Sequence, residues 1–248
     1  MGFSLITYPY ATRVLQVSNL GKVNYASSIA SYFVLLAALG FSTYAIREAS
    51  RVRDNKQKLG SFVNEIYTAN FITVLIAFAL FITAIFTVNK FQDYRLLLLI
   101  NSLSVFSAWI SLSWINVVFE DYLIITIRSI ILHLLLIVLM FIFVKKESDY
   151  YIYAAINVLS NVAISIANGI YIRRYVKPGF TRRPKFKVHI PPVLVFFSNT
   201  LAVSIYLNAD VTMLGWMIGD TPVGLYSVAV RIYTAIRTLI AAVYNVAI

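Results

Sequence analysis

Residues 122–144 read YLIITIRSIILHLLLIVLMFIFV, a run with two basic side chains, Arg128 and His133, and no acidic one. A hydrocarbon core about 30 Å thick needs roughly 20 apolar residues in one helix, and this run is long enough. Similar runs recur along the chain, separated by short charged loops. The sequence therefore predicts an all-α polytopic membrane protein with about seven full spans, at residues 23–47, 62–88, 96–119, 122–144, 150–172, 190–217 and 223–248.

The composition also indicates a membrane protein, and it excludes several kinds of functional site. Hydrophobic residues make up 60% of the 248 and charged residues 12%, so a soluble domain could not bury this much apolar surface. The chain has no cysteine, which excludes disulfides, thiolate catalysis and cysteine-ligated metals. Its two histidines, His133 and His189, are too few for a histidine-rich metal site, and we expect no cofactor.

Both ends of the sequence fall within apolar helices. Residues 3–15 are apolar but too short to cross a bilayer, so we expect them to be the last part of a helix whose start is missing. Ile248 falls inside the last span with no polar flank. The sequence is therefore expected to be a fragment of a longer membrane protein.

Basic residues in the loops indicate the orientation in the membrane. Loops 47–60 and 173–189 carry twelve lysines and arginines, against six in the loops of the opposite side. The positive-inside rule therefore predicts that loops 47–60, 120–122 and 173–189 are cytoplasmic.

Prolines and a glycine divide the chain into two parts. Pro178, Gly179 and Pro184 interrupt any helix in the longest loop. We expect residues 1–177 to form an N-terminal lobe of six helices, the first of them partial. Residues 178–189 would be a basic cytoplasmic hinge, and residues 190–248 the first two helices of a second lobe. Pro191 and Pro192 would fit the first turn of the next span.

A weak internal repeat relates the two parts. The segment GKVNYASSIASY at 21–32 resembles PVGLYSVAVRIY at 222–233, with Tyr25 matching Tyr226 and Tyr32 matching Tyr233. Each copy opens a helix after a short outer turn, and six helices separate their starts. An even number keeps the orientation, so the halves would be related by an axis along the membrane normal.

Four segments carry a resemblance to a known family: TYPYATRVL at 7–15, LGFSTYAIRE at 39–48, NADVTMLG at 208–215 and VGLY at 223–226. They resemble the polysaccharide-repeat flippases of O-antigen and capsule type, in the multidrug/oligosaccharidyl-lipid/polysaccharide exporter superfamily. The resemblance covers nearly all of this chain but only about the first half of a family member.

The resemblance implies a two-lobed transporter of twelve to fourteen helices around a central cavity. Such proteins flip undecaprenyl-diphosphate-linked oligosaccharides to the outer leaflet for O-antigen, capsule or exopolysaccharide assembly. The implied partners are the lipid-linked oligosaccharide, the bilayer and polysaccharide-assembly proteins, with no nucleic acid.

Charged side chains inside the spans are the candidate site residues, because each costs at least about 2.5–3.5 kcal/mol at a helix centre. Arg128 lies about 10 Å into its span from Asp121 at the helical rise. Its side chain would either reach back to the cytoplasmic surface or hold a lipid diphosphate with its bidentate guanidinium. His133, alone among leucines and isoleucines, is expected to be a hydrogen-bonded packing residue.

Two further pairs of charged residues have a plain and a functional interpretation. Arg47 and Glu65 could form a local ion pair, and by the resemblance Arg47 would meet the diphosphate at the inner mouth of the cavity. Asp210 and Arg231 would neutralise each other on adjacent antiparallel helices, or would form a gate whose pairing changes during transport. Arg237 lies deeper on the same helix as Arg231. Asparagines in the spans are expected to bridge helices.

Other functions fit the sequence less well. An enzyme would need a reaction centre, and no nucleophile, metal or phosphate-binding glycine motif is present. A membrane glycan polymerase would need a large extracytoplasmic loop, which the sequence lacks. A drug exporter of the same superfamily is an alternative that the sequence leaves open. A flippase of lipid diphosphates would have arginines facing its cavity, whereas an exporter of cationic drugs would have acidic residues there.

The predicted orientation can be measured directly because the chain has no cysteine of its own. Single cysteines at Asn55 and Lys177 should resist a membrane-impermeant maleimide in intact cells and react after permeabilisation. A single cysteine at Asp93, in an opposite loop, should react without permeabilisation. Reaction at all three sites, or the reverse pattern, would contradict the orientation.

Overall fold

A computed structural model describes residues 2–182 and 184–247, with side chains described from Thr7 to Arg182 and from Pro184 to Arg237. This part of the chain contains helices and no strand, which confirms the predicted all-α class. The longer helices are α1 (Gly2–Ala38), α2 (Phe41–Ser50), α3 (Lys56–Thr87), α4 (Arg95–Ile110), α6 (Tyr122–Phe143), α7 (Tyr150–Tyr171), α8 (Phe186–Met217) and α9 (Asp220–Ala247). Shorter elements are η1 (Asn89–Tyr94), α5 (Ser113–Val118), η2 (Glu147–Asp149) and η3 (Ile172–Arg174).

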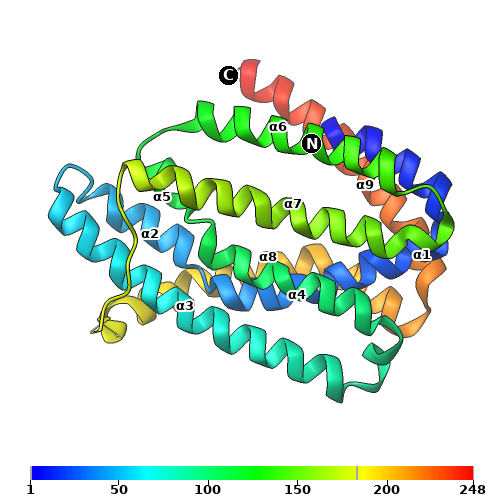
Figure 1. Cartoon of the computed structure of the whole chain (residues 1–248), viewed down its shortest axis with the longest axis horizontal. Coiled ribbons are helices and arrows are strands. Elements are labelled where there is room, and N and C mark those ends of the chain that lie inside the picture. Colours follow the sequence, from blue (N-terminus) through cyan, green and yellow to red (C-terminus); the bar gives the residue numbers. More distant parts are fainter. Residues whose placement is uncertain (1, 183, 248) are drawn as a thin grey trace.

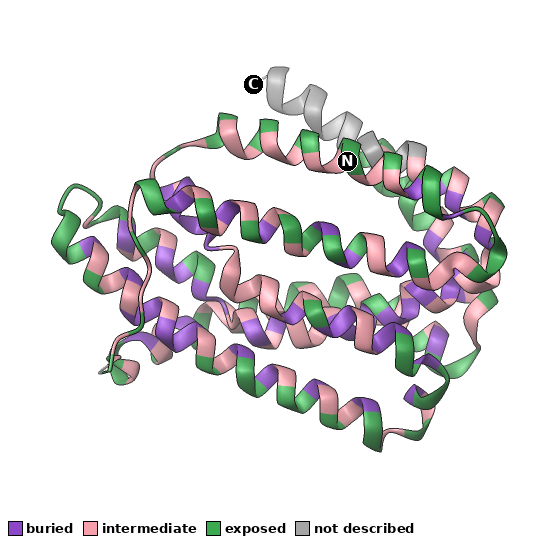
Figure 2. Cartoon of the chain, in the orientation of Figure 1, coloured by how far each residue is buried: buried purple, intermediate pink, exposed green. Residues whose placement is uncertain are grey.

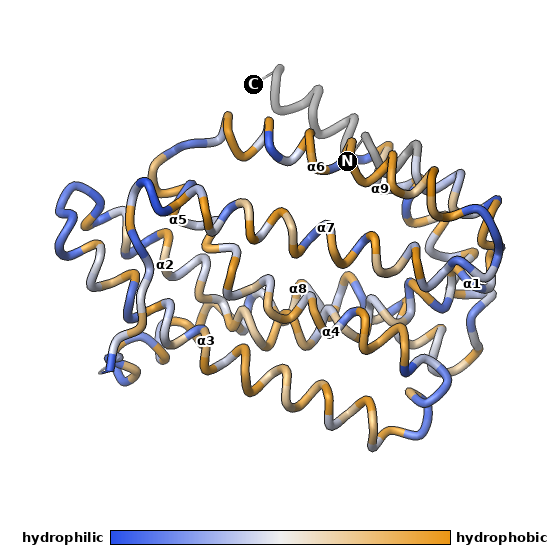
Figure 3. Tube along the Cα trace, viewed as in Figure 1, coloured by the Kyte–Doolittle hydropathy of each residue, from blue (hydrophilic) through white to orange (hydrophobic). Residues whose placement is uncertain are grey.

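The helices lie side by side along the long axis of the molecule (Figure 1), with apolar residues along their length and hydrophilic residues gathered at the two ends (Figure 3). Within the described residues, 6 segments are long and apolar enough to cross a membrane, and they contain the predicted spans from 23–47 to 190–217 or overlap them closely. The predicted span 223–248 corresponds to α9, and Ile248 lies outside the described residues. The chain is a multi-pass membrane protein.

The first helix is two helices joined at a sharp turn. Gln16 has a φ of 67° and a ψ of 157°, which no α-helix allows. The chain reverses there (Figure 1), and the Asn24 amide donates to the Tyr8 hydroxyl at 3.0 Å across the turn. The partial helix expected at residues 3–15 is therefore separate from the first full span.

Two predicted spans, 23–47 and 96–119, are interrupted in the structure. The first breaks at Leu39 and Gly40, whose φ angles are 41° and 78°, and the second breaks at Leu112, with a φ of 40°. Gly40 suits its position because a Cβ there would lie 2.8 Å from the backbone nitrogen of Phe197 on α8. Both segments still match candidate membrane spans, but the breaks were not predicted, since hydropathy does not register a single left-handed residue.

The last cytoplasmic connection also differs from expectation at one point. Helix α8 starts at Phe186, so Pro191 and Pro192 lie inside it and not in its first turn. The connection before α8 packs along α3: the Gly179 amide donates to the Asn64 side chain at 2.7 Å, and the Thr181 amide donates to the Thr68 hydroxyl at 3.0 Å. A hinge at residues 178–189 stays a prediction.

The connections alternate between the two ends of the bundle (Figure 1). The loops between α2 and α3, α5 and α6, and α7 and α8 lie at one end, and those between α3 and α4, α6 and α7, and α8 and α9 lie at the other. This is the arrangement that the loop charges require. It places the two strongly basic loops on the same side.

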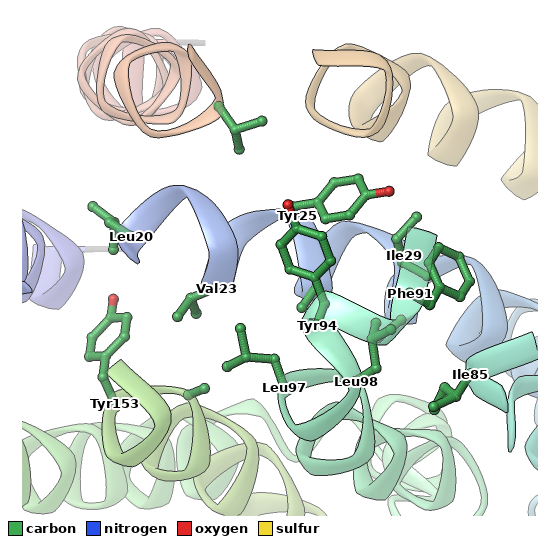
Figure 4. Close-up of a cluster of buried hydrophobic side chains, with 14 of the residues drawn as sticks. Leu20, Val23, Tyr25, Ile29, Ile85, Phe91, Tyr94, Leu97, Leu98 and Tyr153 are labelled. Atoms are coloured by element: carbon green, nitrogen blue, oxygen red, sulfur yellow. The ribbon is translucent and has the colours of Figure 1, made fainter. Parts of the chain in front are cut away.

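Burial distinguishes the centre of the bundle from the faces that contact lipid. Tyr25 and Tyr94 pack edge to face with ring centroids 4.9 Å apart, above Leu97 and Leu98 (Figure 4). Helix α6, in contrast, has mostly exposed or half-buried side chains (Figure 2), and Leu123 is 70% exposed. Because those side chains are apolar, they are suited to hydrocarbon and not to water.

The two repeat segments pack directly against each other. Gly21 on α1 faces the start of α9, where a Cβ would lie 1.9 Å from the Asp220 carbonyl oxygen. Gly224 faces α1, where a Cβ would lie 2.1 Å from the Val17 carbonyl oxygen. Small residues let helix backbones approach closely in a membrane. The contact between α1 and α9 therefore depends on both glycines.

Substitution of Gly21 by alanine should destabilise the fold by about 1–3 kcal/mol, because the added methyl meets backbone that cannot move away easily. The matched control is Gly60→Ala in α3, where nothing lies within 4 Å of the added Cβ. That substitution should be neutral or stabilise by up to about 1 kcal/mol. The melting temperature in detergent measures both. Equal effects of the two substitutions would contradict the close approach.

Candidate functional site

A polar cavity of about 540 Å³ lies between α1, α4 and α7. Asn101, Asn157 and Asn161 line it together with Ser27, Ser31, Ser42, Ser104, Ser107, Ser111, Ser113 and Ser165. No charged side chain lines it within the described residues. Hydroxyl and amide groups offer both donors and acceptors, which suits a ligand that carries many hydroxyls.

The breaks in the helices contribute to this cavity. Ala38 and Ser42 flank the break at Gly40, and Ser111, Leu112 and Ser113 form the break after α4. Non-helical backbone is tolerated at membrane depth only where protein or a water-filled cavity satisfies it. The interruptions that hydropathy did not predict therefore lie beside this polar cavity.

A second pocket, of about 280 Å³, is flanked by two arginines. Arg13 and Arg231 line it with Tyr8, Thr12 and apolar residues of α1 and α9, and no acidic side chain lines it within the described part. The Arg231 guanidinium lies 5.3 Å from the centre of the Tyr8 ring. Arg231 also lines an adjoining polar pocket of about 290 Å³ with Asn24, Ser28 and Asn208. Two cations without a carboxylate make this pocket suited to an anion.

Arg13 was missed from the sequence, where it counted only as a basic residue of an outer turn. Arg13 and Arg231 are far apart in the sequence. They lie at the same pocket because α1 packs against α9. The motif TYPYATRVL contains Tyr8, Thr12 and Arg13. That motif was the signal that the sequence offered for Arg13.

The expected pair of Asp210 and Arg231 is not formed. Asp210 is exposed and accepts a hydrogen bond from the Tyr226 hydroxyl, while Arg231 lies over Tyr8. The two residues lie on adjacent helices as expected, but their side chains have different partners. Arg237 is exposed on α9 and makes no hydrogen bond or ion pair with another side chain of the described part.

Arg128 lies between α6 and α7 and outside the polar cavity. It donates to the Asn168 side-chain oxygen at 2.6 Å, and its guanidinium lies 5.8 Å from the centre of the Tyr171 ring. The space beside it is lined by isoleucines, Leu132 and Ala167. The side chain therefore reaches across to α7, beside Tyr171, and a role in holding a diphosphate stays a prediction.

Asparagines bridge the helices around Arg128, as expected. Asn116 donates to the Asn168 oxygen at 2.5 Å, and Asn168 donates to the carbonyl oxygen of Ser111 at the break after α4. A similar bridge stands at the end of α1, where Asn70 and Thr73 both donate to the Ala37 carbonyl, at 2.8 and 2.9 Å. These side chains satisfy carbonyls that the broken helices leave free.

The local pair of Arg47 and Glu65 is also absent. Arg47 is exposed, pairs with Glu48 at 2.9 Å and lies over the Phe196 ring at 5.3 Å. Glu65 is buried and binds His189 at 2.8 Å and Lys185 at 3.1 Å. His189 was not singled out from the sequence, because no pattern connects it with a glutamate 124 positions earlier.

His133 has the hydrogen bond expected of it, since its Nδ1 lies 2.6 Å from the Ser129 carbonyl oxygen one turn earlier. No cluster of three or more potential metal-binding side chains occurs in the part of the chain that the structure describes.

An ordered cluster surrounds Asp121, which lies between the spans at the end of the bundle that carries the basic loops. Asp121 accepts hydrogen bonds from the hydroxyls of Tyr171, at 2.5 Å, and Tyr175, at 2.6 Å. These two donors, and to a lesser extent the nearby Arg174, hold the pKa of the Asp121 carboxyl below its usual value. The cluster ties the turn before α6 to the end of α7.

Fold and cavities together define a multi-pass helical membrane protein with a polar interior and an arginine-flanked pocket. The model of the family described as "Polysaccharide biosynthesis protein" matches residues 1–248, so the chain belongs to that family. This agrees with the family resemblance found in its motifs.

One curated relative is 24% identical over 241 residues and is named "Putative O-antigen transporter", from Escherichia coli (strain K12). The match covers 95% of this chain and 57% of the relative, so the chain spans little more than half of that protein's length. No solved structure matches the chain.

The Asp121 cluster predicts a pH dependence of stability. A carboxyl whose pKa is lower in the folded state stabilises the fold above its unfolded pKa, about 3.9, and stops doing so as the pH falls through the folded value. Asp121→Asn should therefore lower the melting temperature at pH 7. The difference from the parent should shrink at pH values below about 3.9, where the parent's own carboxyl becomes protonated.

Asp54→Asn is the control, because the Asp54 side chain is 99% exposed. It should change the melting temperature little at either pH. A difference between Asp121→Asn and the parent that stays constant across this range would contradict the role given to the Asp121 carboxylate.

Proposed function

We propose that the chain is part of a membrane transporter that flips undecaprenyl-diphosphate-linked oligosaccharide repeat units to the outer leaflet for cell-surface polysaccharide assembly. Membership of a polysaccharide biosynthesis family and similarity to a protein named as a transporter support this role. The activity belongs to the whole protein, and this chain would supply one lobe and the start of the second.

The observation that carries the proposal is the acid-free pocket between Arg13 and Arg231. A diphosphate needs cationic donors, and arginine offers planar, bidentate hydrogen bonds to phosphate oxygens. The Tyr8 hydroxyl adds a polar group at the same pocket, while the Thr12 hydroxyl donates to the Tyr8 carbonyl at 2.8 Å. The apolar remainder of the lining is suited to the first isoprenoid carbons of the lipid.

Sugars would occupy the polar cavity, where serines and asparagines replace the water that surrounds their hydroxyls. Transport would follow from rocking of the lobe at 1–177 against the second lobe, with residues 178–189 as the hinge. Arg47, exposed at the inner end of α2, would meet the diphosphate on entry, and Arg237 would follow Arg231 along α9. Arg128 would hold α6 and α7 together beside this path.

The charge of the pockets favours this substrate over the alternatives. An exporter of cationic drugs would need a carboxylate at its binding pocket, and Asp210 and Glu65 line neither the arginine-flanked pocket nor the polar cavity. A glycan polymerase would need groups for bond formation, and we assign none. We therefore propose a transporter without enzymatic activity.

The test is flipping of a fluorescent lipid-diphosphate oligosaccharide in liposomes that contain the full-length protein. Removal of one charged hydrogen bond costs about 1.5–3 kcal/mol, so Arg13→Ala and Arg231→Ala should each lower transport about 10- to 100-fold. Lysine at either position should restore part of the loss, since it keeps the charge but not the bidentate geometry.

Arg95→Ala is the matched control, because Arg95 lies over the Phe86 ring at 5.0 Å and lines neither pocket. It should transport like the parent. Full transport by Arg13→Ala and Arg231→Ala, with loss in an Asp210→Asn variant, would overturn the diphosphate site and favour a cationic substrate.

A further inference from the structure

The connection between α7 and α8 lies along the side of α3. It passes α3 near the end of the bundle that carries the basic loops (Figure 1). The Gly179 amide donates to the Asn64 side-chain oxygen at 2.7 Å, and the Thr181 amide donates to the Thr68 hydroxyl at 3.0 Å. These two hydrogen bonds, to positions one turn apart on α3, fix residues 177–182 against the helix.

Phe180, between the two bonded amides, packs on one side and is open on the other. Its ring centroid lies 5.2 Å from those of Tyr67 and Phe71 on α3 and 6.0 Å from that of Trp109 on α4. The residue is nevertheless 61% exposed. A large apolar ring with this exposure is unfavourable in water and suited to the boundary of a membrane's hydrocarbon core.

The length of α3 places Phe180 at that boundary. The helix has 32 residues and is about 48 Å long at the helical rise, whereas the hydrocarbon core is about 30 Å thick. The stretch from Tyr67 to Thr87 contains no charged residue and is about 30 Å long. The boundary at the basic end therefore falls near Tyr67, whose ring contacts Phe180.

The chain around Phe180 is strongly basic. Residues 173–189 include seven lysines and arginines and no aspartate or glutamate. Arg173, Lys177 and Arg182 are exposed, and no acidic side chain of the described part forms an ion pair with them. Cations without a protein partner therefore lie on both sides of the ring, at the level where lipid phosphates begin.

The cations at the start of α3 lie at a different level. Lys56 and Lys58 are exposed and also lack an ion pair with a described residue, but they precede Tyr67 by 11 and 9 residues. Along the helix this is about 17 and 14 Å beyond the hydrocarbon boundary. The headgroup layer is about 5–8 Å thick on each side. These two lysines therefore lie past the headgroups, and residues 177–182 lie among them.

On the hydrocarbon side of this segment, α3 has a row of exposed apolar side chains. They begin one turn after Thr68 and follow a helical spacing of three or four residues, with exposures between 39% and 56%: Ile72, Leu75, Ile76 and Leu80. A lipid whose phosphate lies against residues 177–182 could extend an acyl chain along this row.

We propose that residues 177–182 bind an anionic glycerophospholipid of the leaflet at the basic end of the bundle. Lys177 and Arg182 contact its phosphate, and Phe180 lies beside the first carbons of its acyl chains. Basic side chains at the surface of an anionic membrane each add to the attraction. The site is separate from the pockets of the proposed function, and its lipid would help to hold the connection before α8 against α3.

The effect of lipids on stability tests this site, because a ligand that binds the folded state raises the melting temperature. The purified protein in a neutral detergent is titrated with dioleoylphosphatidylglycerol or with dioleoylphosphatidylcholine. The melting temperature should rise further with phosphatidylglycerol and should reach a plateau. In the double variant Lys177→Gln/Arg182→Gln, the half-saturating fraction of phosphatidylglycerol should increase about 5-fold for each charge removed, or about 25-fold in total.

The matched control is Lys56→Gln/Lys58→Gln, which removes two charges from the same end of the bundle. It should keep the half-saturating fraction of the parent, because these lysines lie past the headgroups. Phe180→Ala should weaken the effect of phosphatidylglycerol, whereas Phe180→Trp should keep it, since tryptophan is suited to the membrane interface. All four side chains at the two pairs of lysine and arginine positions are exposed, so both double variants should fold.

Equal rises with the two lipids, or equal losses in the two double variants, would overturn the proposal. So would a rise with water-soluble glycerol 3-phosphate as large as that with phosphatidylglycerol, since it would show an anion site that needs no membrane surface. Melting temperatures measure no transport, so failure here would leave the proposed flipping activity untouched. Full transport by the arginine variants would likewise leave the lipid site untouched.

Discussion

Every backbone N–H and C=O group within the bilayer must find a partner inside the protein, and this constraint shapes the rest of the structure. It explains the long helices, and it also explains what surrounds their breaks. Asn70 and Thr73 donate to the Ala37 carbonyl at the first break, and Asn168 donates to the Ser111 carbonyl at the second. These three polar side chains therefore bind backbone carbonyls that a continuous helix would have satisfied.

The breaks also show where the protein can hold something polar. Both lie on the cavity lined by serines and asparagines, so the hydrophobic bundle has a hydrophilic space where its helices are interrupted. Charge is kept out of this interior. The cations lie at its margins, where Arg13 and Arg231 flank one pocket and Arg128 is held by Asn168. Under the proposed function, the neutral space would take the sugars and the cationic pocket the diphosphate of one amphipathic ligand.

The class, the spans and the sidedness of the loops could be predicted from the sequence, because hydropathy and loop charge are properties of contiguous residues. The separate helix at residues 3–15 followed from the same kind of local pattern, whereas the contact between the repeat segments was not predicted. Side-chain partners could not be predicted. Asp210 binds Tyr226 in place of Arg231, and Glu65 binds His189 in place of Arg47, because these choices depend on helix rotation and on small backbone breaks such as that at Gly40.

The central claim is that a diphosphate binds between α1 and α9. The most direct measurement is an experimental structure of the full-length protein with a bound lipid diphosphate. The account predicts that both phosphorus atoms lie between Arg13 and Arg231, within hydrogen-bonding reach of their guanidinium groups. Diphosphate bound elsewhere, against Arg128 or against the basic cytoplasmic loop with the Arg13 pocket empty, would contradict it.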